Sequence, residues 1–372
     1  MRAGLAAAAL VALVCACSSP KGPKPAPLPA LGDAAQVRTL WRARVGRADS
    51  YVFEPALAAG SVFAAARDGT VMRLDGGNGH RLWSVSAGTR LSGGVGADER
   101  IVVVANQDGE VVALDAQSGA RRWTARVSSE VIAAPAVGAD LVLVRSIDNR
   151  VFAFGAQDGK RRWIYQRAPA SLIIRAPAGV VMDAETAFAG FAGGKLTAIS
   201  LANGAVRWEA TVALPKGGTE LERVTDVVGD PALSGREVCA ATYQGRVGCY
   251  DAATGRQVWA RDISTLTGVS VDARYAFVAD ERGALQAFDR TNGRSVWKQD
   301  KLANRQLSLP EPVGETVAVG DLEGYVHFLA RDTGAFVARY ATRGGALRAA
   351  PRPLPGGVLV QTQDGSLYAL AL

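Results

Sequence analysis

Apolar and polar residues alternate in short runs, and this pattern recurs along the chain at intervals of about forty residues. The copy at residues 101–123 shows the unit most clearly. A β-branched run leads to Asp108-Gly109, which signals a hairpin turn, and residues 111–114 form the return strand. Asp115 and Gly119 bracket a second turn, and the next strand carries Trp123. With one further strand before each unit, every copy predicts four short strands.

Two kinds of residue mark the repeats. The residue that closes the first hairpin turn recurs as Gly69, Gly109, Asn149, Gly194, Gly245, Gly283, Gly324 and Gly365. The seven tryptophans are Trp41, Trp83, Trp123, Trp163, Trp208, Trp259 and Trp297. From Trp83 onward each stands fourteen residues after its turn residue, as Trp123 follows Gly109. One tryptophan at one fixed position per copy indicates that the side chain packs between neighbouring copies of the repeat rather than forming a cage for a ligand. The seventh copy carries Ala338 there, which predicts a weaker contact.

Short strands repeated in groups of four are typical of a β-propeller, in which each sheet packs on its neighbours in a ring. The last copy stops at Leu372, before its tryptophan strand, whereas Trp41 stands alone near the N-terminus within residues 37–42. We therefore predict an all-β fold, an eight-bladed β-propeller of four-stranded antiparallel blades over residues 35–372. The N-terminal strand completes the C-terminal blade and closes the ring.

The N-terminus reads as a targeting signal. Arg2 is followed by an apolar stretch too short to span a bilayer, so residues 1–16 are predicted to be a signal peptide. Residues 14–17 resemble a bacterial lipobox, in which the final cysteine, here Cys17, receives fatty acyl chains such as palmitate; an ordinary signal peptide with incidental cysteines is the alternative. In such signals an aspartate directly after the cysteine favours retention in the inner membrane, so Ser18 at this position indicates sorting to the outer membrane. Residues 17–34 are then a lipidated cysteine and a Pro-rich tether.

Two cysteines remain after the signal. Cys239 and Cys249 flank one hairpin turn and lie roughly opposite each other on its two strands. A secreted chain enters an oxidising compartment, where disulfides persist. Because cross-strand geometry is demanding, the pair is either a disulfide or two small buried thiols.

Composition argues against several function classes. The net charge is +7, from 42 Lys and Arg against 35 Asp and Glu, but the basic residues are scattered and form no nucleic-acid-binding run. The only histidines, His80 and His327, offer little material for metal or acid–base sites. No phosphate-binding loop or nucleophile motif appears in a suitable context. We therefore expect no catalytic residues, no metal and no cofactor.

Function is expected where the copies differ, because insertions in repeats map to loops on one face. The connections from Trp163 to Pro177 and from Trp208 to Pro231 are the long ones, and they flank the fourth blade. The first carries Leu172, Ile174 and Arg175, and the second carries an acidic stretch over residues 219–230. Apolar residues beside charges are typical of a protein-binding surface. Packing of Leu172 and Ile174 beneath their own loop is the alternative.

The repeat itself resembles the pyrroloquinoline-quinone-type propeller repeat. Together with the lipobox, residues 217–227 (GGTELERVTDV) and residues 319–325 (VGDLEGY) resemble the BamB family, the propeller lipoproteins of the outer-membrane β-barrel assembly machine. The resemblance implies a non-enzymatic scaffold, lipid-anchored in the outer membrane on its periplasmic face. It also implies binding to the periplasmic POTRA domains of the barrel protein BamA. Such a subunit assists folding and insertion of outer-membrane proteins, whose unfolded forms are further candidate partners.

The family's BamA-contacting pattern has a Leu-x-Leu-Arg segment and an Asp-Val-Asp segment. Leu172, Ile174 and Arg175 match the first, with isoleucine for the second leucine, and Asp226 matches the first aspartate of the second. Val228 stands where the second aspartate is expected, so either that contact is absent or Asp230 replaces it.

Two other classes share the fold. Quinoprotein dehydrogenases have an adjacent pair of cysteines, which this chain lacks. A propeller that binds periplasmic glycan or cell wall is the remaining alternative.

Overall fold

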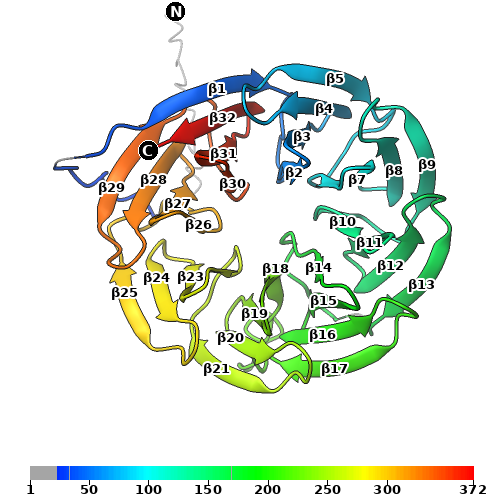
Figure 1. Cartoon of the computed structure of the whole chain (residues 1–372). Helices are drawn as coiled ribbons and strands as arrows, with labels where there is room; N and C mark the ends of the chain where they lie inside the picture. Colours follow the sequence, from blue (N-terminus) through cyan, green and yellow to red (C-terminus); the bar gives the residue numbers. More distant parts are fainter. Residues whose placement is uncertain (1–22, 33, 169) are drawn as a thin grey trace, which may run out of the picture.

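The computed structural model describes residues 23–32, 34–168 and 170–372, so the predicted signal peptide and Cys17 lie outside the described residues. These residues form eight four-stranded antiparallel sheets arranged as blades around a central axis (Figure 1). The prediction of an eight-bladed β-propeller is confirmed. No helix among the described residues is long and apolar enough to cross a membrane.

Each blade runs outward from a short innermost strand to a longer outermost one. Blades one to four are β2(Ala56–Ala58), β3(Ser61–Ala65), β4(Thr70–Asp75), β5(Arg81–Ser86); β6(Gly96–Ala97), β7(Ile101–Ala105), β8(Glu110–Asp115), β9(Arg121–Arg126); β10(Ala136–Gly138), β11(Leu141–Ser146), β12(Arg150–Gly155), β13(Arg161–Gln166); and β14(Val180–Met182), β15(Thr186–Phe191), β16(Lys195–Ser200), β17(Val206–Thr211). Blades five to seven are β18(Val227–Ser234), β19(Glu237–Thr242), β20(Arg246–Asp251), β21(Gln257–Asp262); β22(Ser270–Val271), β23(Tyr275–Ala279), β24(Leu285–Asp289), β25(Ser295–Gln299); and β26(Glu311–Val313), β27(Thr316–Gly320), β28(Tyr325–Ala330), β29(Phe336–Ala341). Blade eight is β30(Arg352–Leu354), β31(Gly357–Gln361), β32(Ser366–Ala371) and the N-terminal β1(Arg38–Arg44).

The register of β1 shows that it is a true fourth strand. In blade two, Ala113 pairs with Trp123 and Leu114 pairs with Arg121, which leaves one bulged residue immediately before the tryptophan. The outermost pair of every blade shifts register at this place. β1 does the same against β32, with Leu40 bulged before Trp41. A bulge bends its strand and turns the bulged side chain away from the sheet, so Leu40 is exposed while Trp41 is buried.

Each tryptophan fastens its blade to the next one. The indole N–H of Trp123 in blade two donates to the carbonyl of Ala156 in blade three, at 2.9 Å, and its ring lies against Gly159. Gly159 has a φ of +63°, and a Cβ there would lie within 3 Å of the ring, so only glycine suits this turn. Trp41 repeats the arrangement between blades eight and one, with Gly76 as acceptor and Gly79 beneath the ring.

The contact between blades seven and eight is built differently. The turn that would receive a tryptophan from blade seven does not exist in blade eight, because the chain ends after β32 and β1 supplies the outer strand. Ala338 is accordingly buried without an indole. Tyr340 packs edge-on against Tyr368 with ring centroids 6.0 Å apart, and Arg42 lies over the Tyr368 ring. The weaker contact expected at Ala338 stays a prediction.

Blade five carries a disulfide between Cys239 and Cys249. The two residues face each other across β19 and β20, with Cα atoms 4.0 Å apart, and both are buried. Trp259 pairs with Cys249 on the outer side, so the bridge lies within the core of the blade. Of the two arrangements that the sequence left open, the structure has the disulfide.

Candidate functional site

The two long connections lie on one face of the ring and touch each other. Residues 167–179 join β13 to β14, and residues 212–226 join β17 to β18, so the two loops flank blade four. The amide of Gly229, just after the second loop, donates to the carbonyl of Pro177 at 3.0 Å. Connections between blades emerge at the same end of the strands as the β15–β16 hairpin. The loops therefore form one continuous surface at that end of the ring.

Asp226 joins the two loops from beneath. Its side chain accepts a hydrogen bond from the Ile174 amide at 2.7 Å and one from Gly193, in the β15–β16 hairpin, at 3.3 Å. The residue is only 5% exposed. Burial raises the pKa of Asp226, while the two amides and the cation of Arg145 favour its ionised form. Asp226 therefore positions the first loop rather than presenting its carboxylate to solvent.

The structure also shows which residue stands near the second acidic position of the family pattern. Val228 is buried, so it has no outward-facing role. Asp230 accepts a hydrogen bond from the Gly179 amide at 2.6 Å and lies at the wall of a central cavity. Asp230, on β18, therefore braces the first loop at Gly179 as Asp226 braces it at Ile174.

Arg175 is an exposed charged residue of the first loop. Its guanidinium makes a forked contact with Glu130, with Nη2 to Oε1 at 2.5 Å and Nε to Oε2 at 3.2 Å. It also lies over the ring of Tyr51, 5.2 Å from the centroid. The Arg175 side chain nevertheless remains 51% exposed. A two-point carboxylate contact and an aromatic support hold an arginine in one orientation while leaving further N–H donors for a partner.

The second loop contains a local turn that raises an apolar side chain above the surface. Glu222 accepts hydrogen bonds from the amides of Gly218 and Thr219, and the Thr219 hydroxyl accepts from the Glu222 amide at 3.3 Å. This reciprocal pattern is that of a capping box. It leaves Leu221 70% exposed.

Exposed apolar residues share this face of the ring with Arg175. Leu172, Ile173, Leu214, Leu221 and Leu266 are all exposed, and all lie in loops that follow the outermost strands of blades three, four and five. Large apolar side chains clustered on one face are uncommon on a free surface and mark contact sites. We call this set, with Arg175, the loop surface.

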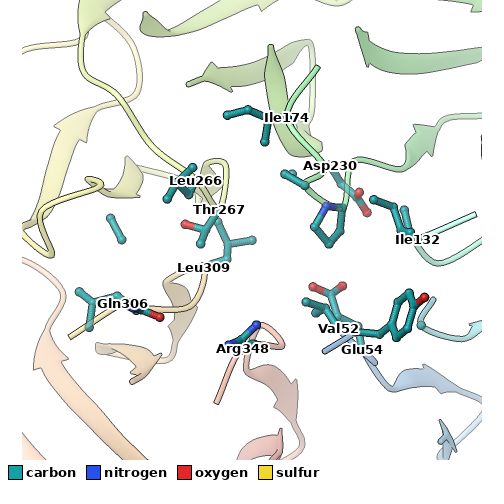
Figure 2. Close-up of a pocket in the computed structure, with 18 of the residues that line it drawn as sticks. Val52, Glu54, Ile132, Ile174, Asp230, Leu266, Thr267, Gln306, Leu309 and Arg348 are labelled. Carbon is teal, nitrogen blue, oxygen red and sulfur yellow. The ribbon is translucent and has the colours of Figure 1, made fainter. Parts of the chain in front are cut away.

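A central cavity of about 420 Å³ opens beside the loop surface. Figure 2 shows Ile174, Leu266 and Leu309 along one part of its wall, and Glu54 close to Asp230. Partial loss of hydration at the cavity wall raises the pKa of Asp230 to about 6, and repulsion from the Glu54 carboxylate adds to the effect. Three or more His, Cys, Asp or Glu side chains are nowhere grouped to hold a metal ion within the described part of the chain.

Glu311, which interacts with Arg352 and Glu54, predicts that the stability of the fold depends on pH. Burial raises the pKa of Glu311 to about 7, against the attraction of Arg352 and with the repulsion of Glu54. A carboxyl that binds its proton more tightly in the folded chain destabilises the fold above that pKa, and the penalty disappears below the ordinary glutamate pKa. Glu311→Gln should therefore raise the free energy of unfolding by about 1–2 kcal/mol at pH 8 and change it little at pH 4.

Thermal melts at the two pH values measure this difference. Glu315→Gln is the matched control, because Glu315 lies on the same blade but is exposed and pairs with Arg331 at the surface. An equal effect of Glu311→Gln at both pH values would contradict the prediction.

The four residues predicted for the partner site lie in the two adjoining loops, but they differ in what they do there. Leu172 and Arg175 are exposed, Ile174 lines the cavity, and Asp226 braces the loop. Sequence reasoning missed Glu130 and Tyr51, which hold Arg175, because no repeat position or motif links them to the loop that carries Arg175. It also missed Leu214 and Leu266, for which no repeat position gives a signal.

Comparison with known proteins agrees with this architecture. The family model described as "Outer membrane protein assembly factor BamB" matches residues 30–89 and 67–299. The outer membrane protein assembly factor BamB of Bordetella pertussis is 45% identical over 345 residues, which cover 92% of this chain and 89% of that protein. The crystal structure of BamB from Moraxella catarrhalis has a TM-score of 0.83 and 26% identity, covering 91% of this chain and 100% of that one.

Similarity also extends to enzymes, but only in fold. The quinohemoprotein alcohol dehydrogenase of Comamonas testosteroni has a TM-score of 0.70 at 13% identity, covering 90% of this chain and 76% of that one. The match to the BamB family, by contrast, extends to the amino-acid sequence, and the members of that family are named as assembly factors rather than enzymes. The chain belongs to the BamB family of outer membrane protein assembly factors.

Proposed function

We propose that this assembly factor is a scaffold subunit that binds the periplasmic POTRA domains of BamA through the loop surface. It would hold BamA in an arrangement that assists insertion of outer-membrane proteins, whose unfolded forms are further partners. The observation that carries the proposal is the juxtaposition of a fixed, half-exposed Arg175 with exposed leucines on two braced loops. Arginine and apolar anchors at the centre of a patch supply most of the energy of typical interfaces.

Binding of purified BamA POTRA domains tests this proposal directly. Immobilised full-length protein should capture the domains, and changing Leu172 and Leu221 together to serine should weaken capture without lowering the melting temperature. The two side chains are exposed, so their loss removes interface area and no core packing. Capture that is unchanged in the double variant would move the site away from the loop surface. Co-purification with cell wall instead of BamA would favour the glycan-binding alternative.

The proposal includes a lipid anchor on Cys17, which lies outside the described residues. Acyl chains on this cysteine would hold the protein at the periplasmic face of the outer membrane without a spanning helix. Cys17→Ser should therefore move most of the protein from the outer-membrane fraction into the soluble periplasmic fraction on cell fractionation. Retention of the variant in the outer membrane at the wild-type level would show that protein contacts, not lipid, are the main anchor.

A further inference from the structure

Part of the Pro-rich tether, residues 23–32, lies against blade seven rather than free of the ring. The amide of Ala26 donates to the carbonyl of Ala303 at 2.9 Å, and the Asn304 side-chain amide donates to the carbonyl of Lys24 at 3.3 Å. Further along, the Ala35 amide donates to the carbonyl of Val337 on β29. Figure 1 shows this segment running along the outer edge of the ring beside β29 before it enters β1.

Two arginines bind the backbone of this segment: Arg305, in the connection that leads from β25 into blade seven, and Arg339, on β29. Arg305 Nη1 donates to the carbonyl of Ala26 at 2.8 Å, and Arg339 Nη2 donates to the carbonyl of Pro29 at 2.9 Å. Prolines at positions 25, 27 and 29 favour the polyproline II conformation. That helix has three residues per turn, so residues 26 and 29 direct their carbonyls to the same side. The two carbonyls that the arginines bind are thus separated by one turn of a polyproline II helix.

The blade is built to hold Arg305 in place. Its side chain is 2% exposed, and Nε donates to Asp321 at 2.7 Å, while Nη2 contacts Glu323. The second oxygen of Asp321 accepts from the amides of Glu323 and Tyr325, each at 2.9 Å. Burying an arginine is costly unless its donors are paired, and here the remaining donor, Nη1, finds its acceptor in the tether. The blade therefore presents a fixed cation that the tether satisfies.

His327 links the two arginines. Its Nε2 is 2.9 Å from Asp321, and its Nδ1 accepts from Arg339 Nε at 3.3 Å. The ring is fully buried, and burial lowers the pKa of His327 against the influence of Asp321, so the neutral ring can donate at Nε2 and accept at Nδ1. The chain from Arg305 through Asp321 and His327 to Arg339 therefore fixes both guanidinium groups relative to each other.

We propose that blade seven carries a binding site for the chain's own Pro-rich tether, formed by Asn304, Arg305 and Arg339 on the Asp321–His327 support. Six residues, 18–23, separate Cys17 from the first tether contact at Lys24, and a segment of that length reaches at most about 20–25 Å. If Cys17 carries the lipid proposed above, the rim of the ring at blade seven is held within that distance of the membrane. The tether then sets the orientation of the propeller and not merely its attachment.

Amide hydrogen exchange of the full-length protein tests the docking, whether or not Cys17 is lipidated. Replacing Pro25, Pro27 and Pro29 by glycine leaves every blade residue intact but removes the stiffness that favours the bound form. We expect the amide of Ala26, which donates to the Ala303 carbonyl in the docked tether, to exchange about tenfold faster or more in this triple variant, since undocking exposes it to water. Pro23→Gly is the control, because Pro23 is exposed. Equal exchange in wild type and triple variant would overturn the proposal.

A second measurement tests the blade side. A fluorescent peptide of residues 22–32 should bind the triple glycine variant, whose site is vacated, at least about tenfold more tightly than wild type, whose own tether competes. Adding Arg339→Ala to the triple variant should abolish peptide binding, whereas adding Arg343→Ala, an exposed arginine near the same blade, should not. Peptide binding that is insensitive to Arg339 would overturn the assignment of the site. Failure of lipid anchoring would leave both measurements unaffected.

Discussion

Deletion of residues 35–44 should lower the melting temperature of the whole propeller by more than about 10 °C, because it removes the strand that closes the ring. β1 pairs with β32 along its length, from Arg38 opposite Ala371 to Arg44 opposite Ser366. Without it, blade eight has three strands, and its interface with blade one loses Trp41.

The contribution of Trp41 can be separated from that of the strand. The indole is buried, donates to the Gly76 carbonyl at 3.0 Å and packs on Gly79. Truncation of such a tryptophan typically costs about 3–5 kcal/mol. For a domain of this length, that cost corresponds to a decrease in melting temperature of about 4–8 °C. Trp41→Ala should therefore be damaging, and the deletion more so.

Thermal melts of four variants distinguish closure from packing. Trp259→Ala, in the middle of the chain, should lower the melting temperature about as much as Trp41→Ala, because both indoles make the same kind of contact. Leu40→Ala, on the same strand, should be nearly neutral, because the bulge leaves Leu40 exposed. A deletion variant that melts within a degree or two of wild type would show that blade eight is complete without β1.

The sequence was sufficient for the fold because each blade repeats the same local signals. Turn glycines, the tryptophan fourteen residues later and the lone Trp41 specify the number of blades and how the ring closes. These are short-range patterns, and each is reinforced by copies elsewhere in the chain. The alanine at position 338 predicted a weaker contact, and the structure adds that the turn that would receive a tryptophan there is absent, because β1 pairs with β32 as the outer strand of blade eight.

Contacts that occur once in the molecule could not be predicted in this way. The length of two loops indicated where a partner surface lies, but not that Asp226 is buried under Ile174 or that Glu130 holds Arg175. Residues 319–325 stood out by family resemblance, yet their structural role, a buried aspartate between Arg305 and His327, depends on residues that no pattern connects. The Pro-rich composition predicted a tether, but its contacts with blade seven had no sequence signal.

Arg175→Glu should abolish co-purification with BamA and weaken binding to its POTRA domains by at least about thirtyfold. The change removes the donors that Arg175 directs outward and places a second carboxylate beside Glu130. Repulsion between the two carboxylates would displace the side chain from the loop surface. Because Arg175 lies in a loop and contributes nothing to blade packing, the melting temperature should change little.

Variants around Arg175 separate orientation from charge. Glu130→Gln keeps the size of the side chain and the charge of Arg175 but removes the forked contact, so binding should fall by a smaller factor, roughly threefold to tenfold. Arg175→Lys should behave similarly, because lysine lacks the planar fork. Arg343→Glu, an exposed charge reversal elsewhere on the ring, should leave binding nearly unchanged and controls for net charge. If Arg175→Glu and Arg343→Glu weaken binding equally, the partner responds to the charge of the whole protein, and the loop surface is not the site.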